Sequence, residues 1–164
     1  MAEQHDAANN KLKLLLAEEL EVITQFKTLL QSEQDNLVAG NTAVLPDITA
    51  SKSTLLDRIN ALSSQQLNLI TSLGFKADKS GMADWVRQCP PELREFWDAI
   101  LNLALEIKGT NQVNGKLINT RLQFTQQTLA SLMAAANQAN LYGPNGQPAG
   151  KPQSKNARGI IGKA

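Results

Sequence analysis

The sequence has very few of the residues from which enzymes build active sites. Its 164 residues include one cysteine, Cys89, and one histidine, His5. A Ser-His-Asp or Cys-His arrangement would have to use His5, and nothing in the sequence places a nucleophile near it. A zinc site of the usual kind needs several His or Cys ligands. These scarcities exclude an intramolecular disulfide, and they predict a protein that is not an enzyme and needs no metal or cofactor.

Long apolar runs and strand patterns are also lacking. No apolar run approaches the roughly 20 residues needed to cross a bilayer, and the N-terminus lacks the basic and then apolar regions of a signal peptide. Aromatic residues make up only 4% of the chain, and no segment shows the alternation typical of strands. Leu, Ala, Gln and Lys favour helices. We therefore predict an all-α protein in the cytoplasm, without stable membrane insertion.

Acidic residues are absent from the last third of the chain. Residues 1–106 hold 9 basic and all 15 acidic residues, whereas residues 107–164 hold 7 basic residues and no acid. Such a split marks either a basic interaction tail or two differently solvated faces. The four basic residues after Tyr142 are widely spaced and have no aromatic residues between them. They would bind phosphates weakly at physiological salt, so we predict no nucleic-acid partner.

Two heptad-like patterns at the front of the chain predict a pair of long helices. They run from about 10 to 39 and from about 42 to 73, and Gly40 and Gly74 fit the left-handed position that ends a helix. Because the connection is short, the two helices are expected to form an antiparallel hairpin. Asn41 is the predicted N-cap of the second helix. Four polar residues interrupt the apolar seams: Glu19, Glu33, Lys52 and Gln66.

The remainder of the chain predicts one short helix, one long helix and a tail. Ser80 is the expected cap of a short helix over about 81–88, in which Trp85 would plug one end of the bundle. The long helix should run over about 91–140, completing a bundle or coiled-coil-like domain over residues 1–142. Residues 143–164 contain five glycines and three prolines, and a segment this polar predicts a flexible, disordered basic tail.

A polar belt from Lys108 to Lys116 divides the long helix. Its two glycines, Gly109 and Gly115, each cost a helix interior up to about 1 kcal/mol, so a bend or fraying is expected there. The belt loosely matches a phosphate-binding loop. However, five residues separate the glycines instead of four, and Leu117 stands where the metal-binding Ser or Thr belongs. No strand precedes it, so nucleotide binding is rejected.

Two short motifs suggest a family. The segments Asn111-Gln112-Val113-Asn114-Gly115-Lys116-Leu117 and Leu141-Tyr142-Gly143-Pro144-Asn145-Gly146 resemble motifs of the FlgN family of flagellar type III export chaperones. The resemblance covers essentially the whole chain. It implies a chaperone that binds the C-terminal helical segments of the hook-filament junction proteins FlgK and FlgL, prevents their premature assembly, and delivers them to the export gate.

The resemblance also implies functional residues. The family's substrate-binding segment falls here on the helix after the Asn-Gly step, and Tyr142 resembles the residue that contacts the gate protein FlhA. The implied substrate-binding residues are Asn114, Gly115, Leu117, Ile118, Leu122, Leu129 and Leu132.

The apolar residues from Leu117 to Leu132 form a stripe along the predicted long helix, and the sequence alone leaves open what this stripe binds. A chaperone for amphipathic helices must offer an apolar stripe at helical spacing that its own core does not occupy. The same stripe would also complete an intramolecular bundle, or a homodimer of the empty protein. The alternative function is therefore a structural coiled-coil protein whose apolar seams drive homo-oligomerisation.

Overall fold

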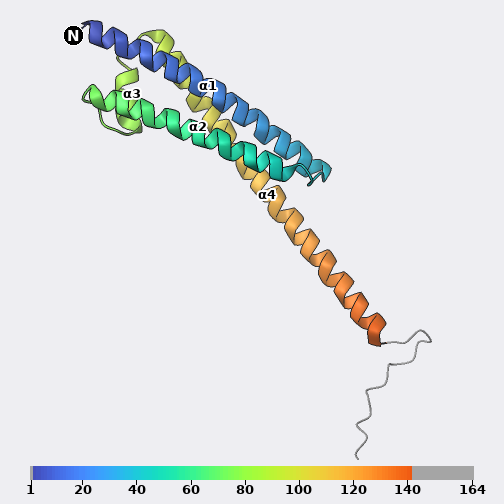
Figure 1. Ribbon diagram of the computed structural model, residues 1–164. Helices are drawn as coiled ribbons and strands as arrows, with labels where there is room; N and C mark the ends of the chain where they lie inside the picture. Colours follow the sequence, from blue (N-terminus) through green and yellow to red (C-terminus); the bar gives the residue numbers. More distant parts are fainter. Residues whose placement is uncertain (1, 142–164) are drawn as a thin grey trace, which may run out of the picture. The chain divides into compact units, whose positions relative to one another are not determined.

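The computed structural model describes residues 2–141, with side chains described over 6–138. This part of the chain forms four helices and no strand, which confirms the all-α prediction (Figure 1). The helices are α1 (Ala2–Ala39), α2 (Leu45–Ser72), α3 (Lys79–Val86) and α4 (Pro91–Leu141). The chain divides into two compact units, which we call unit 1 (Met1–Asn119) and unit 2 (from Thr120 onward) and describe separately.

The α1–α2 hairpin is confirmed, but the predicted cap of its second helix is wrong. Gly40 has φ 80° and ends α1 in the left-handed conformation, as expected. Asn41 does not cap α2, because its side-chain amide donates to the Asn36 carbonyl oxygen Oδ1 at 3.0 Å. Asn41 therefore closes the C-terminal end of α1. Helix α2 begins later, with Val44 at the N-cap position and no side-chain cap.

The short helix α3 is capped by a different residue from the one predicted. Asp78 is the N-cap, and its carboxylate accepts the backbone N–H of Gly81 at 2.8 Å. Ser80 instead donates its hydroxyl to the same carboxylate at 2.8 Å. These two bonds lower the pKa of Asp78, the bond from Gly81 being the stronger influence. Trp85 is buried in the core, where it stacks on Phe75 with ring centroids 6.1 Å apart.

The first helix extends further than its pattern indicated, whereas the last helix has nearly the expected range. Helix α1 begins at Ala2 instead of near Asn10. The early start follows from the helix-favouring alanines there and from the burial of Ala8 in the core. Helix α4 stays α-helical through the polar belt, so the fraying expected at Gly109 and Gly115 does not occur.

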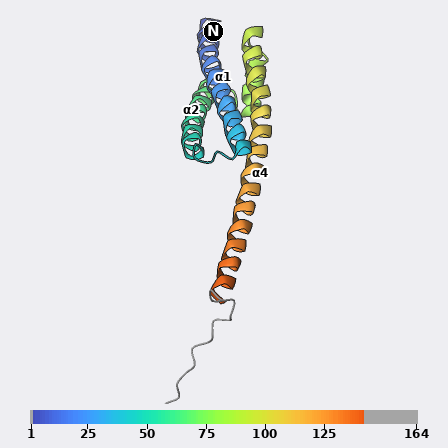
Figure 2. The ribbon, with the colours of Figure 1, turned by 90° about the vertical axis from the view of Figure 1, so that its right-hand side faces the viewer.

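Within unit 1, α4 runs parallel to α1 (Figure 2). Lys13 pairs with Glu92 at 2.7 Å, and further along Lys27 pairs with Glu106. Because the residue numbers rise together on both helices, the two helices point the same way, and α4 is antiparallel to α2. The core between the helices is mainly aliphatic, with one buried tryptophan. Its buried members include Leu12, Leu16, Ile23, Ile70, Met82, Trp85, Leu93 and Ile100.

Candidate partner-binding surface

The four polar residues in the seams of the hairpin pair with one another inside unit 1. Gln66 donates its amide to the Glu19 carboxylate, and both side chains are buried. Lys52 donates to both carboxylate oxygens of Glu33, at 3.1 and 3.0 Å. The interruptions of the apolar pattern are therefore matched across the hairpin. Each pair satisfies polar groups that would otherwise be costly to bury.

Asn114 joins this polar interior from α4. Its side chain is 1% exposed, and its amide nitrogen donates to the Leu30 carbonyl at 2.9 Å and to Glu33 Oε2 at 2.8 Å. Its own Oδ1 is buried without a hydrogen-bond partner among the described residues. A partner cannot reach Asn114 in this arrangement, so its role in unit 1 is to hold α4 against the hairpin.

The other predicted residues of unit 1 lie next to Asn114 and are more accessible. Gly115 and Leu117 are half-buried, and Ile118 is exposed. A Cβ atom built on Gly115 would meet nothing within 4 Å. This glycine is therefore not required by the close approach of a neighbouring helix.

Unit 2 presents an apolar face on its part of α4. Leu122, Leu129 and Leu132 are all more than half exposed, which brings these three predicted residues onto one accessible helix. Phe124, at 70% exposed, and Met133 are exposed as well. They lie on either side of Leu132, so the apolar surface wraps about half of the helix circumference. We define the α4 face as Leu122, Phe124, Leu129, Leu132 and Met133.

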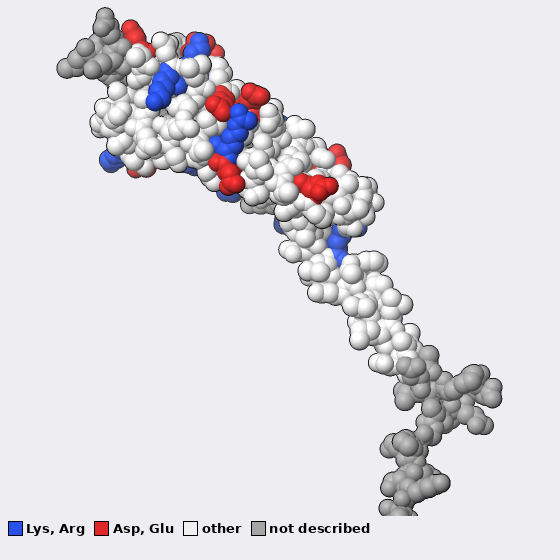
Figure 3. All heavy atoms as spheres, viewed as in Figure 1, with Lys and Arg blue, Asp and Glu red and all other residues white. Residues whose placement is uncertain are grey.

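A shallow hollow of about 290 Å³ lies on the α4 face, and charge is absent around it. Its lining includes Thr125 and Thr128 beside three of the apolar residues. From residue 122 to the end of α4 at Leu141 the sequence has no charged residue, and the described part of this stretch is white on the side seen in Figure 3. Phe124 and Met133 were not among the predicted site residues, although their place in the apolar pattern after Leu117 could have identified them.

Cys89 is not activated as a nucleophile in this structure. Cys89 is buried, and burial raises the pKa of its thiol, which Arg94 lowers to a smaller extent. A raised thiol pKa disfavours the nucleophilic thiolate. Over the described side chains no group of three or more His, Cys, Asp or Glu residues could hold a metal ion. Across residues 2–141 no helix combines the length and apolarity that a membrane span requires.

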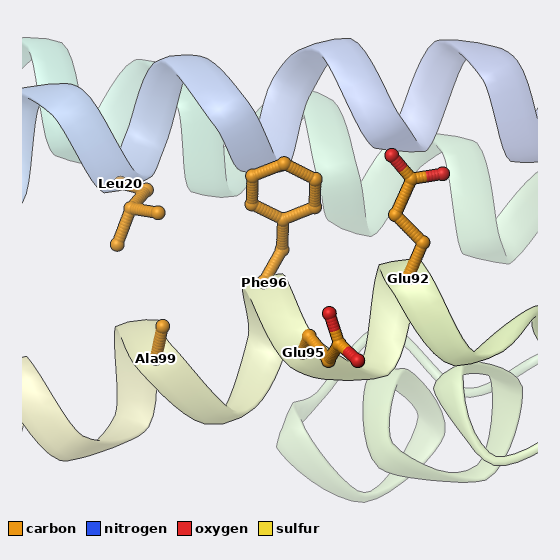
Figure 4. A pocket seen from close by; sticks show the side chains of 5 residues that line it. All are labelled: Leu20, Glu92, Glu95, Phe96 and Ala99. Atoms are coloured by element: carbon orange, nitrogen blue, oxygen red, sulfur yellow. The ribbon is translucent and has the colours of Figure 1, made fainter.

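A hollow between α1 and α4 is lined by apolar residues and by two glutamates of α4 (Figure 4). Phe96 points from α4 toward α1 beside Leu20, and Glu92 and Glu95 lie at its edge. Glu92 is engaged by Lys13 at 2.7 Å. The hollow therefore brings together apolar packing and a surface ion pair.

Tyr142 and the tail over 143–164 lie outside the described residues. The predicted gate-contact residue and the predicted basic tail therefore stay predictions from sequence.

These features define an all-α helical-bundle protein with an exposed, uncharged apolar helix face. Residues 1–150 match the FlgN protein family. The chain is 30% identical over 142 residues to the flagella synthesis protein FlgN of Yersinia enterocolitica, covering 85% of this chain and 90% of the relative. It is 29% identical over 139 residues to the Salmonella typhimurium protein of the same name, covering 84% and 89% of the two chains. No solved structure matches it significantly.

The chain belongs to the FlgN family, as its two motifs indicated. Relatives from Yersinia, Salmonella and Escherichia coli all carry the description flagella synthesis protein. Its role is therefore connected with the flagellum.

Proposed function

We propose that the protein is a cytoplasmic export chaperone for flagellar subunits, with the α4 face as its substrate-binding surface. Its substrates are the C-terminal helical segments of FlgK-type and FlgL-type proteins, which it keeps from assembling early and delivers to the type III export gate. The observation that carries the proposal is the exposure of five large apolar side chains on one helix. Large apolar side chains gathered on one exposed surface mark an interaction site.

The composition of the α4 face fits an amphipathic helix as its ligand. Burying a fully exposed Leu or Phe side chain contributes about 1.5–3 kcal/mol. Micromolar binding requires about 8 kcal/mol beyond the cost of association, so the apolar side chains of both the α4 face and the bound helix must contribute to it. Thr and Gln side chains beside them form hydrogen bonds without the large desolvation cost of a charged group. An amphipathic helix that binds along the α4 face would bury apolar side chains and form hydrogen bonds with these uncharged groups.

The test is a mixing experiment on a sizing column at tens of micromolar protein. A peptide with the C-terminal sequence of a FlgK-type protein is expected to co-elute with the wild type. Leu129→Asp should abolish co-elution, because it places a charge in the middle of the α4 face. Leu14→Asp is the matched control, since Leu14 is 73% exposed on α1 and lies outside the α4 face.

The same column distinguishes the alternative of self-association. Suppose that the wild type is a dimer, that Leu129→Asp dissociates it, and that no peptide complex forms. The protein would then be a homo-oligomeric coiled coil, and the chaperone proposal would be overturned. A dimer that the peptide dissociates would support it, with self-contact in the empty protein and substrate in the loaded one.

Tyr142 is the proposed contact to the export gate protein FlhA. Replacing it by alanine is expected to leave peptide binding intact and to block secretion of the substrate. Loss of peptide binding in this variant would assign Tyr142 to the substrate site instead.

A further inference from the structure

A second groove lies in unit 1, separate from the α4 face. It is formed by α2 and α4 as its two walls, by α1 at its floor and by α3 at one end, and its volume is about 270 Å³. Most of its lining is apolar. The apolar lining includes Ile23 of α1, Ile59 and Leu67 of α2, Met82 of α3, and Trp97 and Leu101 of α4.

The walls of the groove follow helical spacing. On α2 the lining residues Ile59, Ser63 and Gln66 recur at intervals of four and three, and on α4 Trp97, Leu101 and Ala104 do the same. Each wall is therefore one face of a helix over about two turns. Two such faces beside each other form the kind of groove into which a third helix can lay its apolar side.

The floor of the groove carries a buried carboxylate without a cationic partner. Glu19 is 7% exposed, and its hydrogen bond comes from the neutral amide of Gln66. No Lys or Arg forms an ion pair with it in the described part of the chain. Glu33, two heptads further along α1, is equally buried but has Lys52 as its cation.

The difference between the two glutamates has an energetic consequence. Burial raises the pKa of Glu19, and the bond from Gln66 lowers it to a smaller extent. A buried carboxylate is stabilised when a cation pairs with it. Lys79 is exposed at the α3 end of the groove and forms no ion pair with Glu19 among the described residues.

We propose that this groove is a docking site for an amphipathic helix of a partner protein that directs an arginine from its apolar face onto Glu19. Arginine suits the site because its planar guanidinium binds a carboxylate through two parallel hydrogen bonds and keeps its charge when it is buried. The apolar residues that flank the arginine would pack on Trp97 and Leu101. The site does not depend on the proposed chaperone function, because it shares no residue with the α4 face.

The experiment selects helical peptides from a phage library in which the positions of one helix face are randomised. Selection uses the full chain, and binders of the Glu19→Gln variant are removed in each round. We expect the enriched peptides to carry one arginine at a fixed position between large apolar residues. Sequences without a basic residue at a fixed position, or no enrichment over the variant, would overturn the proposal.

A double-mutant cycle then tests the contact itself. Replacing the peptide arginine by glutamine is expected to weaken binding to the wild type about tenfold, or about 1.4 kcal/mol, and to change binding to Glu19→Gln little. Equal losses on both proteins would show that the arginine binds elsewhere.

Two further variants locate the site and keep the result separate from the chaperone proposal. Leu101 lies on a wall of the groove and is 38% exposed. Leu101→Ser should weaken binding of the peptide, whereas Leu14→Ser should leave binding unchanged. Leu129→Asp on the α4 face should leave this peptide bound. Loss of binding in Leu129→Asp would place the peptide on the α4 face and overturn the proposal that it binds in the groove.

Discussion

The side-chain amide of Asn114 on α4 lies 2.8 Å from the Glu33 carboxylate on α1. The same carboxylate binds Lys52 of α2 at 3.0 Å. One buried carboxylate therefore links three helices of unit 1. Because a partly satisfied polar group is costly in a low-dielectric interior, this link favours one arrangement of α4 on the hairpin over its alternatives.

Asn114→Ala is expected to destabilise unit 1 by about 1–2 kcal/mol, because it removes two buried hydrogen bonds. Asn114→Asp should cost more, since it places a second carboxylate beside Glu33. Urea denaturation followed by circular dichroism measures both effects. Asn111→Ala is the control, as Asn111 belongs to the same polar belt but is exposed. A stable Asn114→Ala variant that no longer binds the substrate peptide would return Asn114 to the partner-binding residues.

Lys52→Met is expected to destabilise the protein by about 2–3 kcal/mol, because it leaves Glu33 buried without its cation. The double variant Lys52→Met with Glu33→Gln should recover much of this loss, since the amide needs no cation and still accepts from Asn114. The comparison is Arg58→Met, which breaks the exposed Arg58–Glu18 pair and should cost at most about 1 kcal/mol. Equal losses in Lys52→Met and Arg58→Met would mean that burial of Glu33 has no energetic weight.

The sequence contained the register of the hairpin in its polar residues. Glu19 and Glu33 are two heptads apart on one helix, and Lys52 and Gln66 are two heptads apart on the next. In an antiparallel hairpin this equal spacing allows both pairs to form at once, which the structure shows. The caps were harder to predict. Asn41 and Ser80 are both good capping residues, but their side chains bond to Asn36 and Asp78 instead of to the start of a helix.

Glu19→Gln is expected to stabilise the protein at neutral pH. Burial raises the folded-state pKa of Glu19 above its ordinary value of 4.5. Between these two pKa values the folded state binds more protons than the unfolded state, so the wild type loses stability as pH rises through this window. The advantage of Glu19→Gln should therefore be full above the window and shrink as pH falls toward 4.5.

Urea midpoints of Glu19→Gln and wild type between pH 4 and pH 8 test this prediction. Glu21→Gln, at an exposed position on the same helix, is the control for the loss of one negative charge. An advantage that grows as the pH falls would contradict the assigned direction of the pKa shift.

The candidate surface was predictable only in part. The exposed apolar residues Leu122, Leu129 and Leu132 follow from spacing along a single helix, which is local information. Asn114 could not be assigned in the same way, because polar residues in a belt predict exposure. Its burial depends on hydrogen bonds to Leu30 and Glu33 of α1, and nothing in the local sequence specifies those contacts.

Gly115→Ala is expected to stabilise α4 by about 0.5–1 kcal/mol. Alanine has the higher helix propensity, and a Cβ atom at this position meets nothing within 4 Å. Gly81→Ala is the contrasting variant, since its Cβ would lie 2.0 Å from the backbone oxygen of Lys76 and must displace it. The midpoint temperature of thermal unfolding should therefore rise for Gly115→Ala and fall for Gly81→Ala.

The substrate peptide gives the glycine prediction a second readout. If Gly115→Ala raises stability and leaves peptide binding unchanged, the glycine has no role in either the bundle or the substrate complex. If stability rises while binding weakens, the bare backbone at Gly115 must be approached by the bound helix, because the free protein gives it no other close neighbour. A fall in stability would instead mean that α4 bends at Gly115 in solution, as its polar belt first indicated.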